Sequence, residues 1–115
     1  MATKTLYFSL NASEEGFISK LLKKEKEFDS SDIEKLRRIF SKERGKLLYF
    51  LKREKPKSIY SLAKIIRRDF KSVYSDLKML EKVGIIDFVL EKKGNREKLI
   101  PKIAYDRIEF ILTFN

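Results

Sequence analysis

The residues best suited to chemistry in this sequence are cations, and the chemistry open to them is the binding of phosphate. Lys and Arg number 27 against 17 Asp and Glu, so the 115-residue chain has a formal net charge of +10. Such an excess favours a polyanionic partner, because cations that meet phosphates displace the counterions held there. The candidate contacts fall in two segments, one at a predicted turn and helix and one at a predicted hairpin: Arg67, Arg68, Lys71, Ser72, Tyr74, Ser75 and Lys78, and then Lys92, Lys93, Asn95, Arg96 and Lys98.

The positive charge is concentrated in the later part of the chain. Residues 1–40 carry 8 Lys/Arg and 7 Asp/Glu, a difference of +1, whereas residues 41–115 carry 19 and 10, a difference of +9. A surface of ion-pair networks typical of thermophile proteins is an alternative explanation for the high Lys and Glu content. Such surfaces usually balance their charges, so the uneven excess favours nucleic-acid binding.

The composition excludes most catalytic classes. There is no histidine and no cysteine, which removes disulfides, thiolate zinc sites, cysteine nucleophiles and the commonest general base. No carboxylate cluster adjoins a plausible reaction centre, so we expect no enzyme, no metal and no cofactor. The longest apolar stretches, Leu47–Leu51 and Ile85–Leu90, are too short to span a bilayer. The alternating N-terminal residues do not form a signal-peptide apolar region, and we expect a cytoplasmic protein that does not bind membranes.

Hydrophobic periodicity predicts the elements that would position these cations. Strict alternation predicts strands over residues 3–10 and 105–114, and the helical period predicts helices over about 14–22, 31–40, 42–53, 58–66 and 70–83. Strands over 85–91 and 98–103 flank a turn-prone segment, Lys92-Lys93-Gly94-Asn95, and predict a hairpin. Pro101 in the second of these strands indicates an edge or a bulge. The two terminal strands each have one apolar face and no hairpin partner, so we expect them to pair with each other, within a chain or across a dimer.

Capping residues mark the predicted helix ends. Side chains that accept a hydrogen bond from the first turn favour a helix start, and glycine or proline favours a stop. The apolar face of the first helix would be Phe17, Ile18, Leu21 and Leu22. The expected caps are, in order, Asn11 or Ser13, Ser31 in a capping box with Glu34, Ser41, Ser58 and Asp69, with stops at Pro56 and Gly84.

The helix predicted over 70–83 has two unlike sides. A helical wheel places Val73, Leu77 and Leu80 on the apolar side, and it places Lys71, Ser72, Ser75, Lys78, Met79 and Lys82 on the polar side, with Tyr74 at the boundary. An ordinary solvated helix would have the same pattern. The preceding Arg67-Arg68 pair and the small Ala63 favour a helix-turn-helix in which this helix enters the major groove. The cationic hairpin would then follow the DNA backbone, with Arg96 near the minor groove, although a charged loop that keeps an edge hairpin soluble is an alternative.

Helix, turn, helix and hairpin follow one another from Ser58 to Lys98, and a strand begins with Ala104-Tyr-Asp-Arg-Ile-Glu109. The segment Asp69-Phe-Lys-Ser-Val-Tyr-Ser-Asp-Leu77 is the more specific part of this pattern. On these residues the chain resembles the MarR-like winged helix-turn-helix transcriptional regulators, and it is particularly similar to a small group of predicted archaeal regulators. The resemblance covers about residues 41–112 well and the N-terminal segment more loosely.

The resemblance implies a fold and a function. The fold would be α+β: a winged helix-turn-helix domain with an additional N-terminal strand and two N-terminal helices. Residues 1–40 would serve dimerisation and residues 41–115 would bind DNA. The resemblance makes Phe70–Val83 the recognition helix and Lys92–Arg96 the wing tip of a homodimer at a promoter, often its own. The chain lacks the long dimerisation helix pair that follows the wing in ligand-responsive members, which disfavours small-molecule sensing.

The sequence thus predicts sequence-specific binding of double-stranded DNA by a homodimer that acts as a transcriptional repressor or autoregulator. A nonspecific architectural DNA-binding protein is one alternative, and it fits the high lysine content. A protein-interaction module, such as an antitoxin-like partner, is another. RNA binding is disfavoured because no aromatic pair on a predicted sheet surface lies next to basic residues.

Overall fold

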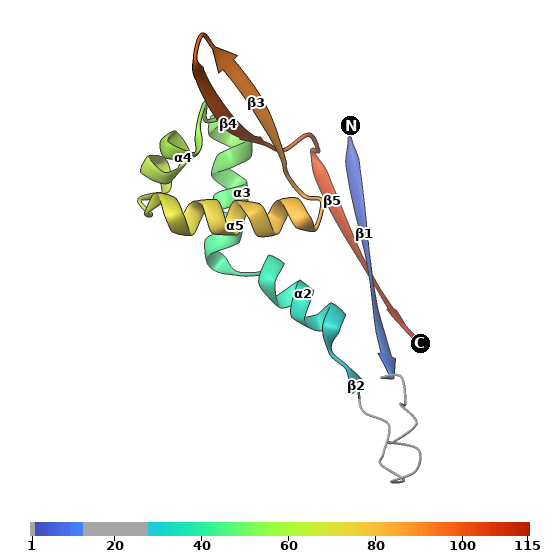
Figure 1. The fold of residues 1–115 in the computed structure, drawn as a ribbon. Helices are drawn as coiled ribbons and strands as arrows, with labels where there is room; N and C mark the ends of the chain where they lie inside the picture. The colour runs from blue at the N-terminus through green and yellow to red at the C-terminus, as the bar shows by residue number, and fades with distance from the viewer. Residues whose placement is uncertain (1, 13–27) are drawn as a thin grey trace.

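In the computed structural model, which describes residues 2–12 and 28–115, helices and strands are mixed along the chain (Figure 1). The α+β class is confirmed. The helix expected over about 14–22, with its cap at Ser13, lies outside the described residues, and Asn11 is a strand residue rather than a helix cap. The order is β1 (Thr3–Ala12), β2 (Phe28–Asp29), α2 (Ser31–Ile39), α3 (Lys42–Glu54), α4 (Ile59–Ile66), α5 (Phe70–Lys82), β3 (Asp87–Lys93), β4 (Arg96–Lys102) and β5 (Arg107–Phe114).

The two terminal strands pair with each other within one chain. They run parallel, from Thr3 opposite Arg107 to Leu10 opposite Phe114, and β2 adds a short antiparallel edge, so the sheet order is β2-β1-β5. Alternation turns Phe8 into the core and packs Phe110 against it. The predicted division at residue 40 therefore separates two strands that share a sheet.

The core lies where α3, α4 and α5 meet the sheet. Apolar positions at helical spacing give each helix one buried side, which is the arrangement expected of helices that cover a common core. Ala63 of α4 is buried, as the sequence predicted. Truncation of a leucine in such a core typically costs about 2–5 kcal/mol. The fully buried side chains are Leu47, Leu62, Val73, Leu77, Leu80, Ile85, Ile86 and Pro101.

Three of the predicted helix caps are confirmed by hydrogen bonds. The Ser41 hydroxyl accepts from the Arg44 N–H at 3.1 Å, and the Ser58 hydroxyl accepts from the Ser61 N–H at 3.0 Å. The Asp69 carboxylate accepts from the Ser72 N–H at 2.9 Å. Gly84 follows α5 with a φ of +85°, as a stop in the left-handed region requires.

The capping box predicted at Ser31 and Glu34 is wrong. Ser31 is the first residue of α2, the cap position is Ser30, and the Ser31 N–H donates to the Asp29 carboxylate at 3.0 Å. The Glu34 side chain instead contacts Arg37 at 3.4 Å. Asp29, Ser30 and Ser31 could each accept a hydrogen bond at the start of α2, and in the structure the Asp29 carboxylate is the acceptor. Phe40, which follows α2, is 62% exposed.

The hairpin of β3 and β4 is longer at its tip than predicted. The ladder continues to Lys93 opposite Arg96, so the turn contains only Gly94 and Asn95. Gly94 has a φ of +60°, which suits the first central position of a type II′ turn. Pro101 pairs with Phe88 in an unbroken register, on an edge strand of this two-stranded sheet.

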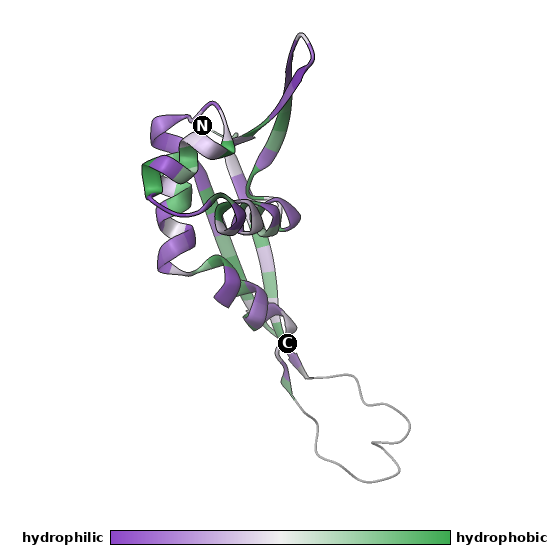
Figure 2. Ribbon diagram, turned by 60° about the vertical axis from the view of Figure 1, so that its left-hand side comes forward, coloured by the Kyte–Doolittle hydropathy of each residue, from purple (hydrophilic) through white to green (hydrophobic). Residues whose placement is uncertain are grey.

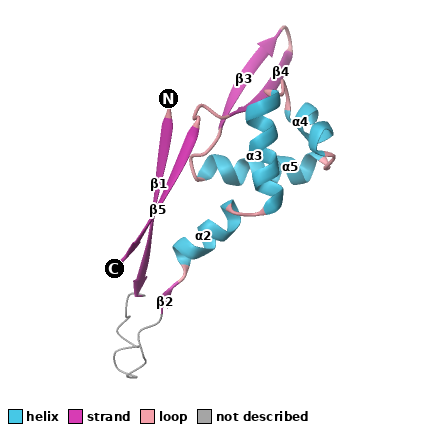
Figure 3. Ribbon diagram, turned by 180° about the vertical axis from the view of Figure 1, so that it is seen from behind, coloured by secondary structure: helices cyan, strands magenta, loops and turns pink. Residues whose placement is uncertain are grey.

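The hairpin projects from the helices at the end of the molecule opposite to α2 (Figures 1 and 3). Its far end is hydrophilic and its base is more hydrophobic (Figure 2). In the described part of the chain, no helix combines the length and the apolar character needed to cross a membrane.

Candidate nucleic-acid interface

The outer face of α5 is exposed and polar, as the helical wheel predicted. Lys71 and Ser75 are exposed, while Val73, Leu77 and Leu80 on the opposite side are buried. The helix is therefore fixed by its apolar side and presents small and cationic side chains to solvent. A helix face of this composition can approach base edges closely while its lysines reach phosphates.

Lys78 lies on the same helix but is partly engaged. Its ammonium group is 3.5 Å from Glu81, and it lies 5.7 Å and 5.2 Å from the ring centres of Tyr74 and Phe88. Tyr74 is half-buried and stacks beside Phe70 with ring centres 6.0 Å apart. These contacts place both side chains on the side of α5 that faces the hairpin.

Arg67 ends α4 in a left-handed conformation. Its φ is +56°, a region that most L-residues avoid. The Arg67 and Arg68 N–H groups donate to the carbonyls of Lys64 and Ala63 at 3.3 and 3.0 Å, which closes the helix end. The Arg67 side chain is exposed and makes no ion pair with any other described residue, so it is open to a phosphate.

Arg68 differs from its neighbour because it is bound inside the protein. Its guanidinium lies 2.8 Å from Asp76, and Arg44 of α3 reaches the same carboxylate at 3.4 Å. The side chains of Arg68, Arg44 and Asp76 are only 22%, 24% and 13% exposed. Arg44 also donates to the carbonyl of Arg38. This cluster ties α2, α3 and α5 together, so Arg68, unlike Arg67, is engaged within the fold.

Ser72 is also engaged in the fold. Its hydroxyl donates to the Asp69 carboxylate at 2.8 Å, in addition to the capping hydrogen bond from its N–H. These two hydrogen bonds, with a smaller contribution from the Arg68 charge, hold the pKa of Asp69 below its ordinary value. Of the two serines predicted to face DNA, Ser75 is thus the one whose hydroxyl makes no bond to another described side chain.

The five candidate residues of the hairpin are all exposed. Lys92 lies 3.5 Å from Glu97, and Lys93 lies 3.9 Å from Glu91. Such exposed pairs contribute little and exchange readily for a phosphate. Arg96 and Lys98 line a hollow together with Phe70 and Tyr74 of α5, which shows that the part of β4 next to the turn adjoins that helix. The members of this set are Lys92, Lys93, Asn95, Arg96 and Lys98.

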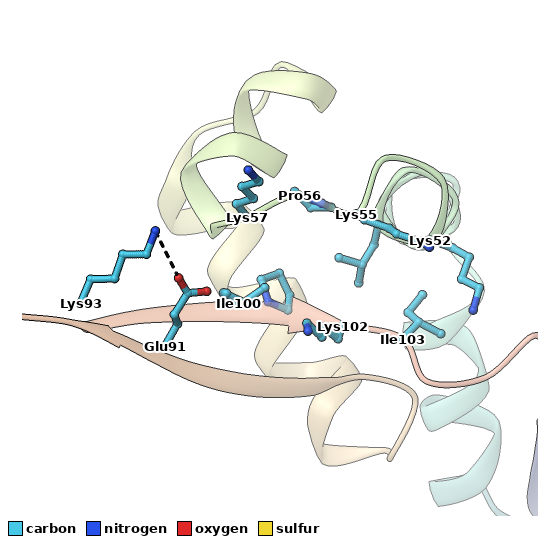
Figure 4. Close-up of a pocket in the computed structure, with 11 residues that line it drawn as sticks. Lys52, Lys55, Pro56, Lys57, Glu91, Lys93, Ile100, Lys102 and Ile103 are labelled. Carbon is cyan, nitrogen blue, oxygen red and sulfur yellow. Dashed lines mark ion pairs between the residues drawn. The ribbon is translucent and has the colours of Figure 1, made fainter. Parts of the chain in front are cut away.

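A lysine-lined pocket on the molecule was not predicted as a site. It has a volume of about 500 Å³, lies between the end of α3 and the hairpin, and has Ile100 and Pro101 among its lining residues (Figure 4). The cation-rich segment from residue 52 to residue 57 is the feature of the sequence that could have indicated this pocket. The cations around it are Lys52, Lys55, Lys57, Lys93 and Lys102. They could contact phosphates on a second face.

An exposed helix face and an exposed hairpin, both cationic, are carried on one α+β scaffold. Among the described residues, no group of three or more His, Cys, Asp or Glu is arranged to hold a metal ion. The chain belongs to the HVO_A0114 family, whose model matches residues 39–110, from the end of α2 into β5. A comparison with curated proteins gave no match.

Proposed function

We propose that this protein is a MarR-like winged helix-turn-helix regulator that binds double-stranded DNA and is not an enzyme. In this proposal α4 and α5 form the helix-turn-helix, α5 enters the major groove, and the β3–β4 hairpin is the wing. The observation that carries it is the adjacency of the two basic segments: Arg96 and Lys98 of the hairpin line the same hollow as Phe70 and Tyr74 of α5. One duplex can therefore meet both segments.

The contacts divide into two kinds. Arg67, Lys71 and Arg96 are exposed cations that would contact phosphates, and Ser75 has an exposed hydroxyl that would contact a base edge. Phosphate contacts position the protein without reading sequence. With roughly four or five such contacts per subunit, affinity would fall steeply with salt.

The sequence placed dimerisation in residues 1–40, but the proposed homodimer would form through the outer edge of β5. The N–H groups of Arg107 and Asn115 donate to the carbonyl of Ala2, just before β1, and to that of Leu10 in β1. The alternate residues of β5 therefore point their backbone groups to the outer edge, where the described chain adds no strand. Leu112 and Phe114 of this strand are 40% and 78% exposed. An edge with neither Pro nor Lys is open to a second copy.

Two-fold pairing of β5 edges would be isologous, with the same surface on both subunits. The recognition helices would then read half-sites about 34 Å apart on one face of the duplex. The operator would be a pseudo-palindrome, and the regulator would act as a repressor, often of its own gene.

A fluorescence-anisotropy titration tests the proposal. The duplex found immediately upstream of the coding sequence is compared with a scrambled duplex of equal length at fixed, near-physiological salt. A hundredfold preference supports specific recognition. The double variant Arg67→Ala/Lys71→Ala should bind both duplexes at least tenfold more weakly, whereas Lys35→Ala on α2 should bind like the wild type.

The lysine-lined pocket favours a second candidate, a nonspecific architectural DNA-binding protein. Cations on a second face would allow the protein to bridge or wrap duplexes of any sequence. Equal affinity for the two duplexes would favour this candidate. Failure to bind either duplex would favour a protein-interaction module instead.

A further inference from the structure

A row of aromatic rings lies across α4 and α5, beside the first residues of β4. The ring centres of Tyr60 and Phe70 are 4.4 Å apart with 26° between the planes, and those of Phe70 and Tyr74 are 6.0 Å apart with 13° between the planes. The three rings are thus nearly parallel. Tyr60, at the outer end, is 66% exposed, and Phe70 is 37% exposed. A ring that is stacked on one side and mostly exposed offers its other face to a ligand.

The row forms one wall of a hollow whose other wall is the hairpin. The hollow has a volume of about 630 Å³, and Arg96, Lys98 and Leu99 line it from β4. The size falls within the range of pockets that hold small organic ligands. Glu97 also lines it, but that carboxylate is paired with Lys92 at 3.5 Å. The hollow therefore combines flat apolar rings with two cations.

We propose that this hollow binds unpaired bases of single-stranded nucleic acid. One base would stack on the outer face of Tyr60, and the adjoining phosphates would be held by Arg96 and Lys98. Aromatic rings that extend a stack of bases, next to cations that hold the backbone, are the general means of binding single strands. Bases inside a duplex are stacked on their own neighbours and present no free face to such a row.

This site is different from the face that the proposed regulator would place in the major groove. Lys71 and Ser75 belong to that outer face of α5, whereas Tyr60 belongs to α4 and projects beside the hairpin hollow. A protein that bound a duplex through α5 could in addition hold a strand exposed by local melting. The single-strand site shares Arg96 with the proposed wing, but Tyr60 lies outside the α5 face, so substitution of Tyr60 tests the single-strand site separately.

The experiment uses a short oligothymidylate that carries one 2-aminopurine, together with the matching oligouridylate and a duplex of equal length. Stacking on a tyrosine ring quenches 2-aminopurine fluorescence, and anisotropy gives the affinity. The wild type should quench the probe. Tyr60→Leu should remove the quenching and weaken single-strand binding roughly five- to hundredfold, and Tyr60→Phe should retain both. Comparison of the affinities for the oligothymidylate and the oligouridylate shows whether DNA or RNA is preferred.

Tyr49→Leu is the matched control. Tyr49 is 54% exposed, and Arg53 lies over its ring at 5.8 Å, but it is on α3 and does not line the hollow. The Tyr49→Leu variant should therefore bind single strands with the affinity of the wild type. Equal single-strand affinity of Tyr60→Leu and wild type would overturn the proposal. An equal loss on single strand and duplex would also overturn it, because the row would then belong to the duplex interface.

Discussion

The two basic segments of this protein are held in opposite ways. At the turn before α5, Arg68 is bound to a carboxylate that it shares with Arg44, and all three side chains are at most 24% exposed. At the hairpin tip, Lys92 and Lys93 pair only with exposed glutamates, and their own side chains are 65% and 86% exposed. The positive charge of Arg68 therefore holds elements of the fold together, whereas the charges of Lys92 and Lys93 remain available at the surface.

This difference has an energetic counterpart. Removing one member of a largely buried ion cluster leaves an uncompensated charge away from water, whereas removing one member of an exposed pair changes little. Arg68 and its two partners should therefore tolerate substitution poorly, and the hairpin tip should tolerate it well. Four variants test this comparison, from the largest expected effect to the smallest.

Asp76→Ala should have the largest effect. It removes the carboxylate that both Arg68 and Arg44 contact, and we expect the free energy of unfolding to fall by about 2–4 kcal/mol. Urea denaturation followed by circular dichroism measures this. The control is Asp87→Ala at an exposed position of β3, expected to change stability by less than about 0.5 kcal/mol. If the two variants lost similar free energies of unfolding, the ion cluster at Asp76 would not be more important for stability than an exposed charge.

Gly94→Ala should destabilise the hairpin by about 1 kcal/mol. A Cβ at this position meets nothing within 4 Å, so the cost is conformational and comes from the φ of +60°. Amide exchange should become faster in β3 and β4 and stay unchanged in α5. Gly45→Ala in α3, also with open space around it, should instead stabilise the helix by about 0.5–1 kcal/mol.

Lys92→Ala/Lys93→Ala should leave stability within about 0.5 kcal/mol of the wild type, because both ion pairs are exposed. If both lysines contact phosphates, the slope of log affinity against log salt should become shallower by about 2. Duplex titrations at several salt concentrations give this slope. An unchanged slope would remove the hairpin tip from the duplex interface.

Asp69→Asn should have a small effect that depends on pH. The pKa of Asp69 is lowered in the folded protein, so its contribution to stability is present above the ordinary pKa of about 3.9 and is lost as the pH falls through the folded value. Asparagine still caps the helix but does not titrate. Between pH 6 and pH 3, thermal stability should fall less in the variant. Asp29 and Asp106, whose pKa values are also lowered, contribute acid sensitivity to both proteins.

Local signals predicted most of the fold. Ser41, Ser58 and Asp69 accept the hydrogen bonds that their positions implied, because a helix cap depends only on the residues beside it. The pairing of the terminal strands followed from their apolar faces. The start of α2 was misplaced because Asp29, Ser30 and Ser31 are all competent caps, and local sequence does not rank them.

The site was less predictable because it depends on contacts between distant residues. Charge and periodicity placed Lys71 and Ser75 at the surface, but they gave the same expectation for Arg68. Its partner Asp76 and the more distant Arg44 lie on other elements, and only the fold brings the three together. The aromatic row was missed for the same reason, since Tyr60 and Phe70 belong to different helices.

The parallel pairing of β1 with β5 has a consequence for the order in which the chain folds. Leu6 and Phe110 are opposite each other in the sheet although 103 residues lie between them in sequence, so closing this loop carries a large entropic cost. The helices and the hairpin need only local contacts and can form early. The pairing of β1 with β5 must form late, and during synthesis on the ribosome β1 must wait for this partner until β5 emerges.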